Sequence, residues 1–243
     1  MGMDFVKELQ REKNVDEIWM IARRQERLKK MEENSMGRLR AFPLDLTKMS
    51  SFDELESVLV KEIPEIVYLV NCAGAGRMGN VDVISCKDHG FVLDLNVRAL
   101  TCMSRICLPY MGEESHIIQL CSGSAFLPQP AFASYAASKA YVLSFSRALR
   151  QEVKSRKISV TIVCPGPVKT EFFEAAGSEV APAKKKFLVE SKDVVRKAIK
   201  DAKSGKELSI YGMSMKLVHL AGKIMPTNVV LAVMNHMMAA KEE

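Results

Sequence analysis

The sequence has no long apolar run, no extended cationic stretch and no metal-binding pattern of cysteine or histidine. No run of 18 apolar residues occurs, so we expect no transmembrane helix. Charges begin at Asp4 without the apolar core of a signal peptide. The six cysteines form no Cys-x-x-Cys pair and the four histidines lack ligand spacing, so no metal is expected. Buried, reduced thiols and a cytoplasmic location are the simplest interpretation.

Basic residues are in mild excess but are not concentrated. The formal net charge is +6, and the densest cluster is the short run from Lys184 to Lys186. A nucleic-acid-binding protein would show a basic stripe or a recognisable module, so we expect no nucleic-acid partner. The excess is compatible with a phosphorylated cofactor or an acidic substrate.

Short apolar runs alternate with amphipathic stretches along the chain. Runs that predict buried strands are Glu17–Ala22, Leu39–Leu46, Ile66–Val70, His116–Cys121, Ser159–Cys164 and, more weakly, Leu208–Tyr211. Residues 87–111 and 134–153 have helical spacing, and Ser51 and Ser191 are expected to cap two further helices. The alternation predicts one Rossmann-like α/β domain over residues 1–243, a doubly wound parallel sheet with helices on both faces.

Polar residues follow several of the predicted strands. They include Arg23, Arg24, Asp45, Asn71, Ser122, Pro165 and Gly166. Ligands of doubly wound sheets bind beyond the carboxyl ends of the strands. These residues are therefore candidates for one binding cleft.

Tyr135 and Lys139 stand four residues apart, on one face of a predicted helix. A nearby ammonium lowers the pKa of a phenol, which suits acid–base chemistry, although the tyrosine could equally pack while the lysine faces water. Ser122 either offers its hydroxyl to a substrate carbonyl or only closes a turn. Asn96 is a disfavoured residue inside a helix, so it either has a hydrogen-bonding task or is a simple polar interruption.

Together these residues resemble the motifs of the short-chain dehydrogenase/reductase family. Asn71–Gly74 resembles the family's Asn-Asn-Ala-Gly turn, with Cys72 replacing the second asparagine. Asn96, Ser122, Tyr135 and Lys139 match the catalytic tetrad in order and spacing. Pro165–Val168 followed by Thr170 resembles the Pro-Gly-x-Val-x-Thr loop. The resemblance extends over nearly the whole chain.

The resemblance implies a role for each residue of the tetrad. Tyr135 exchanges a proton with the substrate oxygen that Ser122 holds, while Lys139 lowers the pKa of Tyr135 and binds the nicotinamide ribose. Asn96 helps to hold a water chain. The residues expected at the cofactor are Gly2, Arg23, Arg24, Asp45, Leu46, Asn71, Ala73, Gly74, Asn96, Tyr135, Lys139, Pro165, Gly166, Val168 and Thr170.

The residues after the first predicted strand favour NADP(H), with NAD(H) as the alternative. A carboxylate at this position binds the ribose of NAD, whereas arginine accommodates the 2′-phosphate of NADP. The chain has Arg23 and Arg24 here, and guanidinium groups match phosphate in charge and geometry. The two residues could instead simply begin a basic helix. By resemblance, Asp45 contacts the adenine ring.

The family's opening strand and glycine-rich turn are missing from the sequence. Residues 1–5 resemble the tail of that motif, with Gly2 at its last glycine and residues 4–13 as the first helix. The absence predicts unpaired strand edges and fewer phosphate contacts. We expect a fragment or a misplaced start; a genuinely shortened and impaired protein is the alternative.

The last third of the chain is expected to cover the substrate. A substrate loop is expected over residues 171–190. Its apolar side chains either line a pocket or simply pack in the fold; they are Phe172, Phe173, Phe187 and Leu188. The apolar helical segment 213–240 closes the pocket, packs in an oligomer or contacts a membrane surface. By resemblance, the helices at 87–111 and 134–153 form a homodimer or homotetramer, although an apolar helix face is equally consistent with packing in the core.

Three functions are compatible with these features. The leading one is an NADP(H)-dependent oxidoreductase that interconverts a carbonyl and a secondary alcohol, with a lipophilic substrate such as a fatty-acyl or steroid-like compound. The alternative is a catalytically impaired protein that binds the cofactor in a regulatory role. Epimerisation or dehydration of a nucleotide sugar is disfavoured because no second substrate domain is present.

Overall fold

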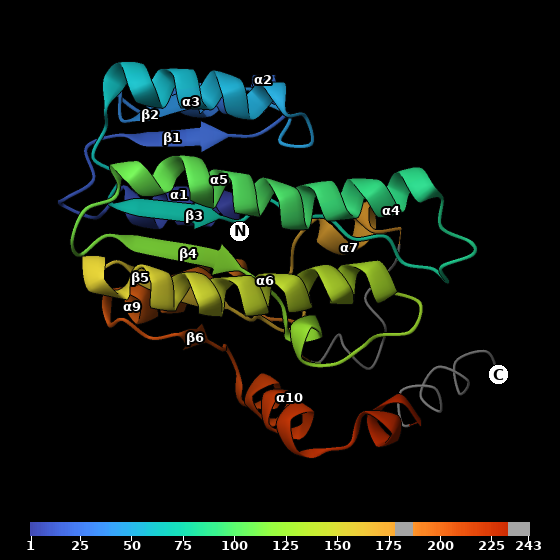
Figure 1. Ribbon diagram of the computed structural model, residues 1–243. Helices are drawn as coiled ribbons and strands as arrows, with labels where there is room; N and C mark the ends of the chain where they lie inside the picture. The colour runs from blue at the N-terminus through green and yellow to red at the C-terminus, as the bar shows by residue number, and fades with distance from the viewer. Residues whose placement is uncertain (178–186, 233–243) are drawn as a thin grey trace.

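The computed structural model describes residues 1–177 and 187–232, in which strands and helices alternate (Figure 1). The elements are α1 (Gly2–Leu9), β1 (Ile18–Ile21), α2 (Gln25–Glu33), β2 (Leu39–Phe42), α3 (Ser50–Glu62), β3 (Tyr68–Asn71), α4 (Cys86–Leu93), α5 (Ala99–Cys107), β4 (His116–Leu120), α6 (Ala133–Glu152), β5 (Ser159–Val163), α7 (Phe172–Ala175), α9 (Ser191–Lys203), β6 (Leu208–Ser209) and α10 (Met213–Ile224). Each predicted strand is present. Parts of the predicted segments 171–190 and 213–240, and the cluster Lys184–Lys186, lie outside the described residues.

The strands form two parallel sheets. One has the order β1-β2, and the other has the order β3-β4-β5-β6. All pairs are parallel, which confirms the predicted α/β class. No backbone hydrogen bond joins β1 to β3 within residues 1–177 and 187–232, so each strand pairs on one side only. The unpaired edges lie where the sequence predicts that an opening strand is missing.

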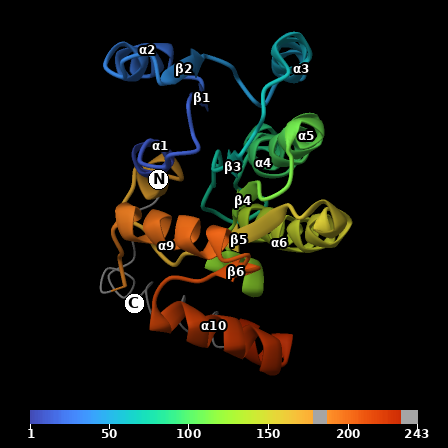
Figure 2. The same cartoon turned by 90° about the vertical axis from the view of Figure 1, so that its left-hand side faces the viewer.

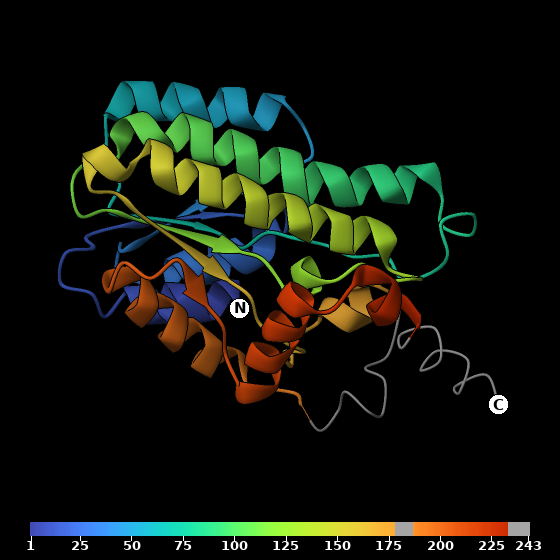
Figure 3. The same cartoon turned by 60° about the horizontal axis from the view of Figure 1, so that its bottom comes forward.

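Helices cover both faces of the strands (Figure 2). In this view α1 and α9 lie on one face and α5 and α6 on the other, while α10 lies beyond β6. Figure 3 shows the run from α4 to α5 lying beside α6. This arrangement agrees with a doubly wound sheet, which has helices on both faces.

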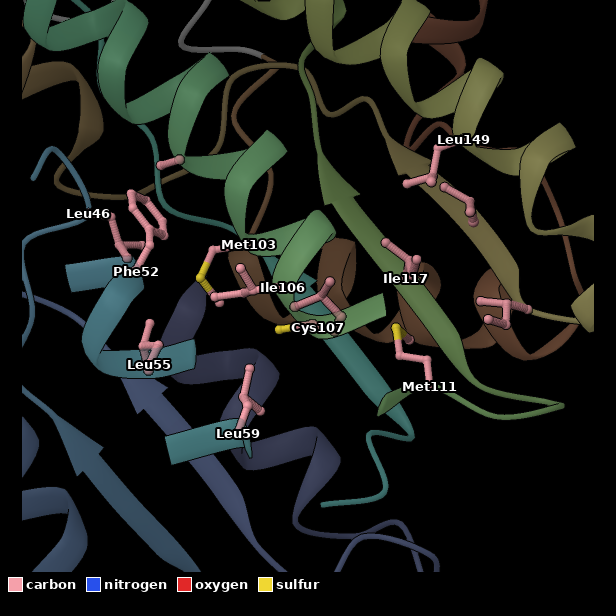
Figure 4. Packing of buried hydrophobic residues seen from close by; sticks show 14 of the residues in the cluster. Leu46, Phe52, Leu55, Leu59, Met103, Ile106, Cys107, Met111, Ile117 and Leu149 are labelled. Carbon is pink, nitrogen blue, oxygen red and sulfur yellow. The ribbon is translucent and has the colours of Figure 1, made fainter. Parts of the chain in front are cut away.

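The main core lies between the sheet and the helices of one face (Figure 4). Leu55 and Leu59 of α3 pack towards Met103 and Ile106 of α5, and Ile117 of β4 is fully buried beside them. A second cluster joins α1 and α9 to the other face of the sheet. β4 and β5 are buried from their second residue onward because they are covered on both faces.

Both predicted capping residues are corrected by the structure. α3 begins at Ser50, and Ser51 donates a hydrogen bond to the Asp45 carbonyl at 2.8 Å instead of capping the helix. Ser191 is the first residue of α9 and donates to an Asp4 carboxylate oxygen at 2.6 Å. Ser51 thus bonds to the turn six residues before it, and Ser191 bonds to a distant helix, so neither hydroxyl caps its helix.

Candidate active site

Three elements carry the predicted tetrad. Ser122 directly follows β4, and Tyr135 and Lys139 lie one turn apart on α6. Asn96 lies in a π-helical turn, η1 (Asp94–Arg98), between α4 and α5. Such a turn inserts an extra residue into a helix and is frequent at functional sites. Asn96, Tyr135 and Lys139 are all buried.

Asn96 ties the loop after β3 to helix α6. Its side-chain NH2 donates to the Ala75 carbonyl and to Ser138 Oγ, both at 2.9 Å, and its oxygen accepts from the Ala75 backbone N–H at 2.8 Å. A Cβ on Gly74 would meet Asn96 Oδ1 at 3.2 Å and Lys139 Nζ at 3.5 Å. Asn96 therefore has a hydrogen-bonding task, and Gly74 permits its close approach to the loop.

Tyr135 lies under two phenylalanine rings. Phe132 stacks on it with ring centroids 4.4 Å apart, and Phe172 from α7 lies at 5.3 Å. Burial raises the pKa of Tyr135 well above its ordinary value, and the side chain of Ser122 opposes this rise only in part. The phenol is therefore in its protonated form near neutral pH.

The net pKa of Tyr135 is raised in this structure, whereas the resemblance implies that Lys139 lowers it. Its Nζ lies over the Tyr135 ring, 5.7 Å from the centroid, and donates to the Leu120 carbonyl at 2.9 Å. Burial lowers the pKa of Lys139 itself, because removal from water disfavours an ammonium. The expected effect of a nearby positive charge is thus overcome by the burial of both partners.

Three cysteines adjoin Lys139, a feature that the sequence pattern did not reveal. Cys121 and Cys164 are buried at the ends of the neighbouring strands β4 and β5, and the Cys121 thiol lies 3.2 Å from the Lys139 carbonyl. Burial raises the pKa of the Cys72 thiol. All six cysteines are free, as predicted, but the prediction that they are buried holds for only three of them. Cys107, Cys121 and Cys164 are buried, Cys72 and Cys102 are half-buried, and Cys86 is exposed.

A cavity of about 2410 Å³ runs along the carboxyl ends of the strands and into the space between β1 and β3. Every predicted cofactor residue except Asn96 lines it: Gly2, Arg23, Arg24, Asp45, Leu46, Asn71, Ala73, Gly74, Tyr135, Lys139, Pro165, Gly166, Val168 and Thr170. Ser122 lines it as well. Of the predicted pocket residues, Phe172, Phe173 and Phe187 are part of its wall, and Leu188 is not.

The arginines after β1 stand at one end of this cavity. Arg24 pairs with Glu171 at 3.0 Å, and Arg27 pairs with the same carboxylate at 3.2 Å. The Arg23 guanidinium lies over the Phe91 ring, 5.3 Å from its centroid. Glu171 comes from the distant loop before α7, so sequence reasoning did not connect it with the arginines. An incoming phosphate would compete with its carboxylate.

Asp45 and Leu46 follow β2 in different environments. Burial raises the pKa of Asp45, but two hydrogen bonds from Thr47 to one carboxylate oxygen outweigh it, so the net pKa is lowered. Asp45 is therefore ionised near neutral pH. The Leu46 side chain packs in the main core beside Phe52 (Figure 4).

The predicted loop after β5 is held from two sides. The Pro165 carbonyl accepts from the Gly123 backbone N–H at 2.9 Å, and Val168 forms a parallel bridge to Val189. A Cβ on Gly166 would meet Met215 Cγ and Sδ at 2.9 Å. Met215 belongs to α10, and no sequence signal linked it to this loop.

The residues present fit a dinucleotide. Gly74, Tyr135 and Lys139 stand together at one end, and Arg23 and Arg24 stand at the other, along one continuous cavity. α1 begins between them, since Met1 and Gly2 line the same cavity, and the first N–H groups of a helix favour a phosphate. Within the described residues, no cluster of histidine, cysteine or carboxylate side chains could hold a metal.

Comparisons with known proteins find a matching family model and related sequences. The family model for short chain dehydrogenases matches residues 1–181. An NADP-dependent 3-hydroxy acid dehydrogenase of Escherichia coli is 34% identical over 154 residues, which is 62% of this chain and 62% of that protein. The alignment thus spans less than two thirds of this relative.

Two solved structures share the fold. A short-chain dehydrogenase from Sphingobium yanoikuyae in complex with NADPH has a TM-score of 0.77 and 23% identity, covering 91% of this chain and 88% of that one. A short chain dehydrogenase/reductase from Burkholderia phymatum in complex with NAD has a TM-score of 0.76 and 18% identity, covering 91% and 89% of the respective chains.

Proposed function

The chain belongs to the short-chain dehydrogenase family, whose members are oxidoreductases acting on CH–OH groups with NAD(P), and we propose that it interconverts a carbonyl and a secondary alcohol with NADP(H). One observation carries this proposal. Ser122, Tyr135 and Lys139 line the same cavity as the residues expected to hold the dinucleotide. A substrate oxygen at Ser122 and Tyr135 would then face the cofactor.

Each residue of the tetrad has a distinct task in the proposed reaction. When bound, the nicotinamide supplies or accepts the hydride. In reduction, the Tyr135 hydroxyl gives its proton to the substrate oxygen, which Ser122 orients by a hydrogen bond. Lys139 holds the nicotinamide ribose, and Asn96 fixes the loop that carries Gly74 against α6. The raised pKa of Tyr135 keeps its proton in place for this direction.

NADP(H) is favoured over NAD(H) by the charges after β1. Arg23 and Arg24 are exposed at the cavity, where the 2′-phosphate of NADP would replace the Glu171 carboxylate on Arg24. The similarity to an NADP-dependent relative supports this choice. NAD(H) is the alternative, because a solved structure of the same fold binds it.

The substrate is proposed to be lipophilic, of a fatty-acyl or steroid-like kind. Phe132 and Phe172 lie against Tyr135, and Met215 and Val218 of α10 line the same cavity. An apolar wall around a few polar groups suits a lipophilic molecule that carries one carbonyl or hydroxyl group.

The alternative is an impaired protein that binds the cofactor without turnover. The unpaired edges of β1 and β3 favour it, because a pyrophosphate site needs a firmly held backbone. Tyr135→Phe separates the two functions. If the protein is the proposed enzyme, this variant should lose at least a hundredfold in kcat and still bind NADPH. If it is the impaired protein, the unmodified chain already shows no turnover.

The matched control is Tyr141→Phe, which removes a hydroxyl from the exposed face of the same helix. It should leave kcat unchanged with a panel of lipophilic ketones. Full activity of Tyr135→Phe would contradict the proposed function.

We also propose that the chain forms a homodimer or homotetramer through the run from α4 to α5 and through α6. These long helices lie side by side on one face (Figure 3). Leu93 and Tyr141 are exposed on them. Light scattering after gel filtration tests this proposal, since Leu93→Asp with Tyr141→Asp should give a monomer and a monomeric unmodified chain would contradict it.

A further inference from the structure

Helix α10 has two opposite faces. The inner face packs against the loops at the active site, where the Met215 side chain fills the space beside Gly123 and Gly166. His219 lies against the Phe126 ring, with centroids 4.3 Å apart. Gly222 allows the Phe126 carbonyl to approach, since a Cβ there would meet this oxygen at 2.8 Å. These contacts of the inner face hold α10 against the loops of the active site.

The outer face is apolar, and it is uncovered within residues 1–177 and 187–232. Met213, Leu217, Leu220 and Ile224 recur at the spacing of a single helical stripe, and they are 51–73% exposed. A surface helix of a soluble protein normally has polar side chains on this face. In Figures 1 and 2 the helix lies beyond β6, at the margin of the layered helices and strands. The stripe is therefore accessible to a large flat partner.

Charges beside the stripe are of one sign. Lys216 and Lys223 are seven residues apart, so both lie on the same flank of the stripe, and both are exposed. The sequence contains no aspartate or glutamate from Leu208 to Lys241. By contrast α9, of similar length, contains Asp193 and Asp201. An apolar stripe with lysines on its flank and no carboxylates is complementary to anionic lipid headgroups above acyl chains.

We propose that the outer face of α10 docks on an anionic lipid surface. The apolar stripe enters the boundary between headgroups and acyl chains, and the lysine stems extend to the phosphates. The contact is peripheral, since no described helix is long and apolar enough to span a bilayer. The inner face of the same helix contributes Ser214, Met215 and Val218 to the cavity wall. A chain docked through α10 would therefore hold this wall of the cavity next to the membrane surface. The inference goes beyond the proposed function and needs no turnover to test.

Vesicle co-sedimentation of the full chain tests the proposal. Vesicles of equal parts phosphatidylcholine and phosphatidylglycerol should bind the chain, and vesicles of pure phosphatidylcholine should bind it much more weakly. Leu217→Asp with Leu220→Asp should abolish binding. The control, Val60→Asp on α3, introduces a carboxylate at another exposed apolar position and should leave binding unchanged.

A second pair of variants tests the charges. Lys216→Gln with Lys223→Gln should weaken binding to the anionic vesicles by about fivefold for each lysine. Lys29→Gln with Lys30→Gln on α2 is the matched control and should have no effect. All replaced side chains are exposed, and circular dichroism should be unchanged.

Two outcomes would overturn the proposal. One is equal binding to neutral and anionic vesicles, or binding to neither. The other is a dimer in gel filtration that Leu217→Asp dissociates while no vesicle binding occurs, which would assign the stripe to a second copy of the chain.

Discussion

The two sheets differ in how completely they are enclosed. β4 and β5 have a partner strand on each side and helices on both faces, and their side chains are almost entirely buried. β1 pairs only with β2, and Met20 is the only buried residue of this strand. Ser122 follows the enclosed sheet, whereas Arg23 and Arg24 follow the sparsely covered one. The residues of the proposed chemistry therefore lie at the enclosed sheet, β3-β4-β5-β6. The residues proposed to bind the 2′-phosphate lie at the sparsely covered sheet, β1-β2.

Hydrogen exchange should show the largest difference between the two sheets. Amides of β4 and β5 open only with global unfolding, whereas β1 and β2 can open locally. A difference of about 4 kcal/mol corresponds to about a thousandfold in protection. Exchange measured by mass spectrometry on peptides from the two sheets checks this expectation, and equal protection would remove the distinction.

Truncation of a buried side chain should lower the free energy of unfolding more in the enclosed sheet than in the sparsely covered one. Ile118→Ala removes a fully buried side chain of β4 and should lower the free energy of unfolding by about 4 kcal/mol. Met20→Ala in β1 should cost about 2 kcal/mol, because its surroundings can relax. Urea unfolding of both variants measures the two losses. A larger cost for Met20→Ala would reverse the comparison.

Helix α9, which covers one face of the enclosed sheet, should contribute an ion pair that is sensitive to acid. Burial raises the pKa of Asp201 in α9, but hydrogen bonds from Lys197 at 2.5 Å, from Ser209 and from Lys206 at 3.0 Å outweigh it, so the net pKa is lowered. A lowered folded-state pKa stabilises the fold above the unfolded value of about 3.9, and this stability is lost as the pH falls through the folded value.

Asp201→Asn should therefore cost about 2 kcal/mol at neutral pH. It should also flatten the fall of stability with acid below about pH 4. Urea unfolding across this pH range tests both effects. Asp193→Asn, in the first turn of the same helix, is the control, and an unchanged acid slope in Asp201→Asn would contradict the assignment.

The smallest effect is expected at the sparsely covered end of the cavity. Glu171→Gln frees Arg24 and Arg27, so NADPH should bind about threefold more tightly, in keeping with the modest strength of an exposed ion pair. NADH should be unaffected because it lacks the 2′-phosphate. Glu174→Gln is the control on α7. A similar gain in affinity for NADH would show that the effect does not come from the 2′-phosphate.

Much of the fold follows from short-range patterns in the sequence. Apolar runs such as that of β4 locate the strands, because a strand buried on both faces must be apolar throughout. The helical run around Asn96 and the pair Tyr135 and Lys139 follow equally from spacing. The strand ends are set by pairing rather than composition, so β2 ends at Phe42, four residues earlier than predicted.

The features that the sequence did not predict depend on contacts between distant segments. Glu171 reaches Arg24, and Met215 reaches Gly166, across long stretches of chain. The burial of Tyr135 under Phe172 reverses the direction of its pKa shift, which local spacing to Lys139 could not indicate. Ser191 bonds to Asp4, near the other end of the chain, instead of capping α9.

Fluorescence titration of the full chain with NADPH and with NADH tests the central claim most directly. The claim is that one cavity, spanning both sheets, holds a nicotinamide dinucleotide with its 2′-phosphate at Arg23 and Arg24. We predict saturable binding of both cofactors, with NADPH the tighter, and loss of this preference in Arg24→Ala. Absence of binding by either cofactor would contradict the account.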